Sequence, residues 1–66
     1  MNMTQSEAEQ LVTDELGKKG STDVKFNNVV MGENTIRVKA SYKNNGVGES
    51  KELLVLRMGG RWRVLL

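Results

Sequence analysis

The most suggestive group of side chains lies near the end of the sequence, in the run LRMGGRWRVLL (residues 56–66). Trp62 stands there between Arg61 and Arg63, directly after a pair of glycines. This combination could bind single-stranded nucleic acid, because bases stack on an exposed aromatic ring and phosphates attract arginine. The same residues also fit the last strand of a small sheet, where the tryptophan and the arginines would lie on opposite faces. The elements around the motif decide between the two interpretations.

Catalytic chemistry has little support in the sequence. There is no histidine and no cysteine, so the commonest general bases, nucleophiles and zinc ligands are missing. Asp14 and Glu15 are adjacent, but neighbouring residues of a helix point apart and make poor acid–base partners. Glu49 and Glu52 near a loop show no typical spacing, and the glycines of the hairpin turns have no helix after them to hold a phosphate. We therefore expect a chain that is not an enzyme and needs no cofactor or metal.

The first third of the chain predicts one helix. The stretches TQSE and SEAE both match the capping box, in which a hydroxyl and a carboxylate satisfy backbone donors at the start of a helix. The apolar residues that follow helical spacing are Ala8, Leu11, Val12 and Leu16. Gly20 is a natural stop, so we expect a helix over about 4–19.

The rest of the chain predicts strands joined by short turns. TIRVKASYK (35–43) alternates most clearly, and Asn45-Gly46 fits a hairpin turn. The expected strands cover about 23–31, 35–43, 50–58 and 61–66. Because the turns are short, consecutive strands must be antiparallel neighbours. The sequence thus predicts a single α+β domain of residues 1–66, with the helix packed on a four-stranded antiparallel meander (α-β-β-β-β).

The register of the last hairpin decides which residues share a face with Trp62. If the two glycines alone form the turn, Arg57 lies opposite Trp62; if Met58 joins them in a three-residue loop, Leu56 does. The second register gives the cleaner apolar face, and we adopt it. That face consists of Leu54, Leu56, Trp62 and Val64.

The opposite face of the sheet then carries apolar side chains among basic ones. Its expected members are Leu53, Val55 and Leu65, with Val29 or Val30, among Arg37, Lys39, Arg57, Arg61 and Arg63. Residues 24–66 hold eight basic groups against three acidic ones, whereas residues 1–23 hold two against five. An exposed apolar patch rimmed by charge usually marks an interaction surface.

The order of these segments resembles the strand-rich half of cystatin-like and nuclear-transport-factor-like domains, especially the lumazine-binding-like domains of unknown function in bacterial lipoproteins. The motifs are V-x-F-x-x-V, then IRVKASYKNNG, then L-x-L-R-M-G-G-R-W-R-V after the helix. The last hairpin of that family ends in a charged-Gly-Lys-Trp-Lys-hydrophobic run, which matches residues 60–64. The resemblance implies a small, non-catalytic bacterial domain that dimerises through its sheet. The sequence lacks the family's preceding helices and lipoprotein cysteine, which indicates a minimal or truncated version.

These observations favour a protein-interaction or self-associating module that uses the mixed apolar and basic sheet face, with a homodimer or a protein partner. One alternative is a nucleic-acid-binding protein, whose phosphate contacts would be Arg37, Lys39, Arg61 and Arg63. Another is a small-ligand pocket between helix and sheet. No signal peptide or membrane span is visible, so we expect either a cytoplasmic protein or an excised domain of an exported one.

Overall fold

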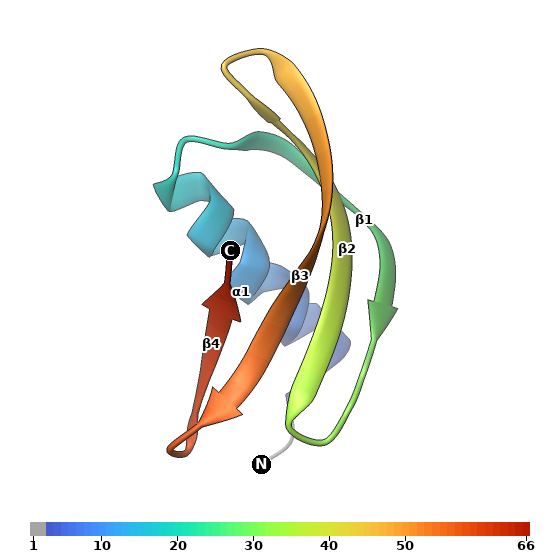
Figure 1. Ribbon diagram of the computed structural model, residues 1–66, viewed down its shortest axis with the longest axis vertical. Helices are drawn as coiled ribbons and strands as arrows, with labels where there is room; N and C mark the ends of the chain where they lie inside the picture. The colour runs from blue at the N-terminus through green and yellow to red at the C-terminus, as the bar shows by residue number, and fades with distance from the viewer. Residues whose placement is uncertain (1–2) are drawn as a thin grey trace.

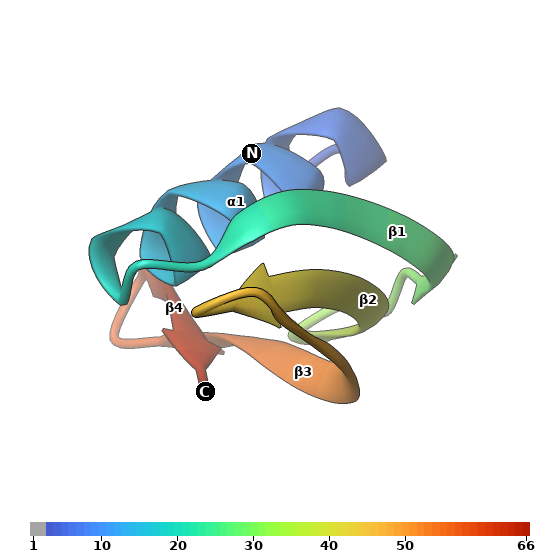
Figure 2. The same cartoon turned by 90° about the horizontal axis from the view of Figure 1, so that it is seen from above.

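The structure, a computed structural model, describes residues 3–66 and consists of one helix followed by one sheet. The elements are α1 (Gln5–Lys18), β1 (Thr22–Val30), β2 (Thr35–Asn44), β3 (Val47–Met58) and β4 (Arg61–Leu65). The strands are antiparallel and lie in the order β1-β2-β3-β4 (Figure 1). The helix packs on one face of the curved sheet (Figure 2), and within residues 3–66 no element covers the opposite face. The predicted α+β meander is confirmed.

Both ends of α1 are fixed by local hydrogen bonds. At the start, Thr4 and Glu7 form the predicted capping box: the Glu7 N–H donates to the Thr4 hydroxyl, and the Thr4 N–H donates to the Glu7 carboxylate. At the end, Gly20 has a φ of 85° and donates to Gly17, while Ser21 donates to Leu16. This pair of bonds is the Schellman motif, which requires a left-handed residue that glycine adopts without strain.

The turn at Asn45-Gly46 sets the register of the central hairpin. Both residues have positive φ, 52° and 79°, as the type I′ turn between two strands demands. Because the turn contains only these two residues, Asn44 pairs with Val47 and β3 begins about three residues earlier than the sequence predicts. The pairing then continues along the full length of β2.

The core lies between α1 and the sheet. Its buried members are Ala8, Val12 and Leu16 of α1, Ile36, Val38, Ala40 and Tyr42 of β2, and Leu53 and Val55 of β3. Leu11, Val24, Phe26, Val29, Trp62 and Val64 are half-buried around them. The predicted apolar faces of the helix and of β2 are therefore confirmed.

Two register shifts in β1 decide that Val29 rather than Val30 packs on the core. One lies between Thr22 and Lys25, where Asp23 has a φ of 54°, and the other lies between Phe26 and Asn28. Such β-bulges add a residue to one strand and change which side chains face the core. Val29 consequently packs on the core with Phe26, and Val30 is exposed.

The last hairpin adopts the register that we rejected. Gly59 and Gly60 have φ values of 58° and 77° and form a two-residue turn by themselves. Arg57 lies opposite Trp62 and Val55 opposite Val64, so the preference for a three-residue loop was wrong. The physical reason is that two left-handed glycines match the twist of the flanking strands without help from Met58.

Candidate interaction surface: the outer face of the sheet

The sheet face that points away from α1, here called the outer face, follows from the strand register, because paired residues share a face. Its members in β1 are Thr22, Lys25, Asn28 and Val30; in β2 they are Thr35, Arg37, Lys39, Ser41 and Lys43. In β3 they are Gly48, Ser50, Glu52, Leu54, Leu56 and Met58, and in β4 they are Arg61, Arg63 and Leu65. Apolar side chains gather at one end of this face, and basic side chains run through the whole of it.

Three predicted members of the interaction face lie elsewhere. Leu53 and Val55 are 3% and 0% exposed and pack in the core beneath α1, so placing them on the outer face was wrong. They pair with Val38 and Ile36. Arg57 is exposed but shares the helix-side face with Trp62. The cause is the register of the last hairpin: the shift by one residue moves every β3 side chain to the other face.

The other predicted members are on the outer face. Arg37, Lys39, Arg61, Arg63 and Leu65 all lie there and are exposed. The prediction missed the β3 residues that accompany them, Leu54 and Leu56, because it assigned both to the core. The two-residue turn at Asn45-Gly46 carried the signal that would have found them.

The apolar residues and two arginines form a compact group that we call the arginine–leucine patch. Its members are Val30, Arg37, Leu54, Leu56, Arg63 and Leu65. Val30, Arg37, Leu54 and Leu65 form one row across all four strands, in which Val30 is 52% and Leu65 46% exposed. In the next row, Leu56 lies between Thr35 and Arg63. Leu54 and Leu56, the two patch leucines of β3, thus each have an arginine as a direct cross-strand neighbour.

The outer face is strongly basic, and few acidic side chains lie on it to neutralise its positive charge. It carries six basic residues, Lys25, Arg37, Lys39, Lys43, Arg61 and Arg63, against one acidic residue, Glu52. Within residues 3–66 only two ion pairs form: Lys43 with Asp23 at 4.0 Å, and Lys18 with Glu15 at 3.3 Å. The patch arginines have no carboxylate within ion-pair distance in this part of the chain.

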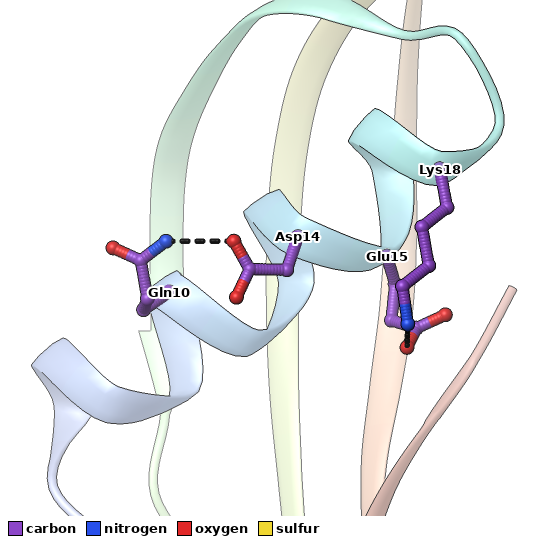
Figure 3. Close-up of polar contacts among 4 residues, drawn as sticks. All are labelled: Gln10, Asp14, Glu15 and Lys18. Carbon is purple, nitrogen blue, oxygen red and sulfur yellow. Dashed lines mark hydrogen bonds and ion pairs between the residues drawn. The ribbon is translucent and has the colours of Figure 1, made fainter.

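The acidic side chains of α1 lie on the helix surface and take separate partners. Gln10 donates to Asp14 at 2.8 Å, and Lys18 donates to Glu15 at 3.3 Å (Figure 3). Figure 3 shows that the two adjacent carboxylates point apart, as the sequence predicted. Residues 3–66 contain no group of three or more aspartate, glutamate, histidine or cysteine side chains that could hold a metal ion. No helix in the same residues is long and apolar enough to cross a membrane.

The aromatic side chains lie on the helix side. Tyr42 is buried, and Phe26 and Trp62 are half-buried against the core. The arginines on either side of Trp62 point to the outer face. The RWR motif therefore does not place a stacking ring beside its two cations, and the strand interpretation of the motif is confirmed.

Two recesses lie beside the β2–β3 hairpin, and both are lined in part by Tyr42 and Glu49. One of about 550 Å³ is lined mainly by charged and small polar residues, among them Lys25, Lys43 and Ser50. A smaller one, about 200 Å³, lies between the end of α1 and β3 and is lined in part by Leu16, Leu53 and Leu66. This recess and two others between α1 and the sheet, of about 240 and 280 Å³, are each below the range of about 300–1,000 Å³ typical of ligand pockets.

Comparisons of this chain with protein-family models, with curated proteins and with solved structures find no match.

Proposed function

We propose that this chain is a non-catalytic protein-binding module that docks an acidic partner on the arginine–leucine patch. The single observation that carries the proposal is the row Val30–Arg37–Leu54–Leu65, in which one cation lies among three apolar side chains across all four strands. Apolar groups supply contact area, and unpaired cations supply attraction for carboxylates.

Charge favours a different molecule over a second copy at this face. Two copies stacked outer face to outer face would oppose six cations with six cations. Like charges brought into contact cost several kcal/mol. This repulsion opposes the free energy that the small apolar patch would gain from contact with a second patch. A partner that carries acidic and apolar residues meets both properties of the patch.

A nucleic acid would use only half of the surface. Phosphates would contact the arginines and lysines, but Leu54, Leu56 and Leu65 would have no role. Base stacking, which supplies much of single-strand binding, needs aromatic rings on the same face. Phe26, Tyr42 and Trp62 all lie on the other side of the sheet. These points favour a protein partner.

Fluorescence anisotropy with three labelled probes tests the proposal. The first probe is a peptide of about one strand length, ~6 residues, with the order Leu-Leu-Glu-Glu-Leu-Leu, so that each face of the extended peptide carries both leucine and glutamate. The second is a glutamate–serine peptide of the same charge, and the third is an oligothymidylate of similar length. We expect the leucine–glutamate peptide to bind more tightly than the other two, because it alone satisfies both the cations and the apolar row.

Matched substitutions assign the binding to the patch. Arg37→Glu should weaken binding of the leucine–glutamate peptide by about tenfold or more. Lys18→Glu makes the same charge change on α1 and should leave binding nearly unchanged. Equal effects of the two substitutions would contradict the proposed site. Tighter binding of the oligothymidylate, with loss of binding as salt rises from about 50 to 200 mM, would favour the nucleic-acid alternative.

A further inference from the structure

Within residues 3–66, part of β3 is a sheet edge with no strand beside it. β4 pairs with β3 only from Met58 to Leu54, whereas β3 extends back to Val47. Figure 1 shows the β2–β3 hairpin continuing well past the end of β4. In the described part of the chain, residues 48–52 therefore have a neighbour on the β2 side only. A free stretch of this kind offers backbone groups for pairing with another strand.

The register shows which backbone groups face outward. Residues that flank a two-residue turn exchange both hydrogen bonds, so Val47 bonds toward β2 and Met58 bonds toward β4. Since the direction alternates along a strand, the residues that direct their N–H and C=O groups to the free edge are Gly48, Ser50 and Glu52. The edge therefore presents three donors and three acceptors.

The charges along this edge are complementary to themselves. In an antiparallel pair with its two-fold axis at Ser50, Glu49 of each copy lies opposite Lys51 of the other. Moving the axis by two residues to another outward-facing position, Gly48 or Glu52, removes both Glu–Lys pairs. A lone lysine on an edge strand normally repels a second edge, but here the partner position holds a carboxylate.

The Glu49 carboxylate is held in a fixed position on the helix side by a hydrogen bond from β2. Ser21 donates to the Asn44 side chain at 2.6 Å, and the Asn44 amide donates to the Glu49 carboxylate at 2.9 Å. The Glu49 side chain is half-buried on the helix side of the sheet, where Lys51 is exposed. Because the carboxylate is fixed before a second copy arrives, less side-chain entropy is lost on pairing.

An exposed valine and a recess of mixed polar and apolar lining also face each other in this register. Val47 is 63% exposed on the helix side, and the axis at Ser50 brings it opposite Leu53 of the second copy. The recess beside Leu53 is lined in part by Leu16 and Leu66, together with polar and charged side chains that include Glu49 and Lys51, and lies on the same side of the sheet. Each copy would thus cover the recess of the other.

From these observations we infer that the chain pairs with a second copy of itself through the 48–52 edge of β3, antiparallel and with a two-fold axis at Ser50. The two four-stranded sheets become one continuous sheet. Since paired residues share a face, both helices lie on one side and both arginine–leucine patches on the other. The edge dimer does not depend on the proposed function, but it would give an acidic partner two adjacent copies of its site.

Sedimentation of the 66-residue chain tests the inference first. The chain should be dimeric at high micromolar concentration. Ser50→Pro removes an N–H that points to the free edge, so the bonds to β2 remain and the dimer should weaken by about tenfold or more. Ser50→Thr keeps the N–H and should stay dimeric. A wild-type chain that remains monomeric, or a folded Ser50→Pro variant that dimerises as well as wild type, would overturn the inference.

A charge exchange tests the register even if the proline variant fails to fold. Glu49→Lys and Lys51→Glu should each weaken self-association, because each places like charges opposite one another. When the two variants are mixed, every lysine faces a glutamate again, and a heterodimer should form about tenfold more tightly than either homodimer. Leu54→Lys should leave the edge dimer intact, which separates it from contact through the outer face. Mixed variants that associate no better than either variant alone would contradict the edge.

Discussion

The two faces of this sheet use the same strands for different purposes. On the helix side, Ile36, Val38 and Val55 are all 0% exposed and form a continuous apolar layer. On the outer side, Arg37 lies between Ile36 and Val38 along β2, and Leu54 next to Val55 is only half-buried. Both faces contain leucine and valine, so apolar character alone does not distinguish them. The difference lies in what covers each face and in the charges that surround it.

The two faces also differ in the hydrogen bonds and ion pairs that their polar side chains form. Near the helix side, Ser21, Asn44 and Glu49 form a chain of hydrogen bonds that joins the end of α1 to the central hairpin. On the outer side, the side-chain contact of this kind is Asn27 to Ser41 at 2.9 Å, and the patch arginines have no carboxylate partner in residues 3–66. The hydrogen bonds of Ser21, Asn44 and Glu49 thus join elements within the fold, while the patch arginines keep their charges available.

The largest expected effect comes from placing a lysine on each face at adjacent positions. Val55→Lys buries a charge under α1 and should cost about 3–5 kcal/mol, which is enough to unfold a domain of this size. Leu54→Lys places the same group on the outer face and should cost about 1 kcal/mol, because that side chain reaches water. Thermal and urea unfolding followed by circular dichroism measure both.

The comparison would fail if the two lysine variants had similar stabilities. A folded Val55→Lys chain would mean that β3 carries Leu54 toward the helix, which is the register of the three-residue loop. Leu54→Ser provides the control for size, since it shortens the outer-face side chain without adding charge.

The sequence contained enough information to fix these two faces. A two-residue turn at Asn45-Gly46 requires Ile36 to lie opposite Val55, so Val55 belongs to the face that β2 already buries. Two-residue turns at both hairpins place Val64 on that same face, whereas a three-residue loop at Gly59-Gly60 would put the faces of β2 and β4 in conflict. Propagating the first turn along the strand, rather than comparing apolar faces at the last hairpin alone, would have given the correct register.

Other features could not be read from the residue pattern. The bulge between Phe26 and Asn28 places two apolar residues three positions apart on one face, and no local composition signals it. The sequence therefore left Val29 and Val30 open as members of the outer face. The free edge at residues 48–52 is also invisible in the sequence, because it depends on how far β4 extends along β3.

A smaller effect is expected at the motif in β4, where neighbouring residues again serve opposite faces. Trp62 is half-buried against the core on the helix side, so Trp62→Ala should cost about 2–3 kcal/mol, less than a fully buried aromatic. Arg63 is exposed on the outer face, and Arg63→Ala should change stability by less than about 0.5 kcal/mol while weakening binding of the leucine–glutamate peptide. Chemical unfolding and anisotropy together separate the two roles.

A loss of binding in Trp62→Ala together with a loss of stability in Arg63→Ala would contradict the placement of these two side chains. If Trp62→Ala reduced binding of oligothymidylate without loss of stability, the ring would be a stacking platform rather than part of the core. Arg61→Ala serves as the matched control, because it lies on the same face as Arg63 but pairs with Met58 outside the arginine–leucine patch.

The smallest expected effect concerns acid, and it belongs to the helix rather than to the outer face. The Thr4 backbone N–H, and after it the Thr4 hydroxyl, hold the pKa of Glu7 below its ordinary value of 4.5. A carboxyl whose pKa is lower in the folded state stabilises the fold above its unfolded pKa, and this contribution disappears as the pH falls through the folded pKa. Glu7→Gln keeps an oxygen that accepts the Thr4 N–H but does not titrate. We therefore expect a shallower decline of the melting temperature below about pH 4.5 in Glu7→Gln than in wild type, and parallel declines would show that the capping box is not a source of acid sensitivity.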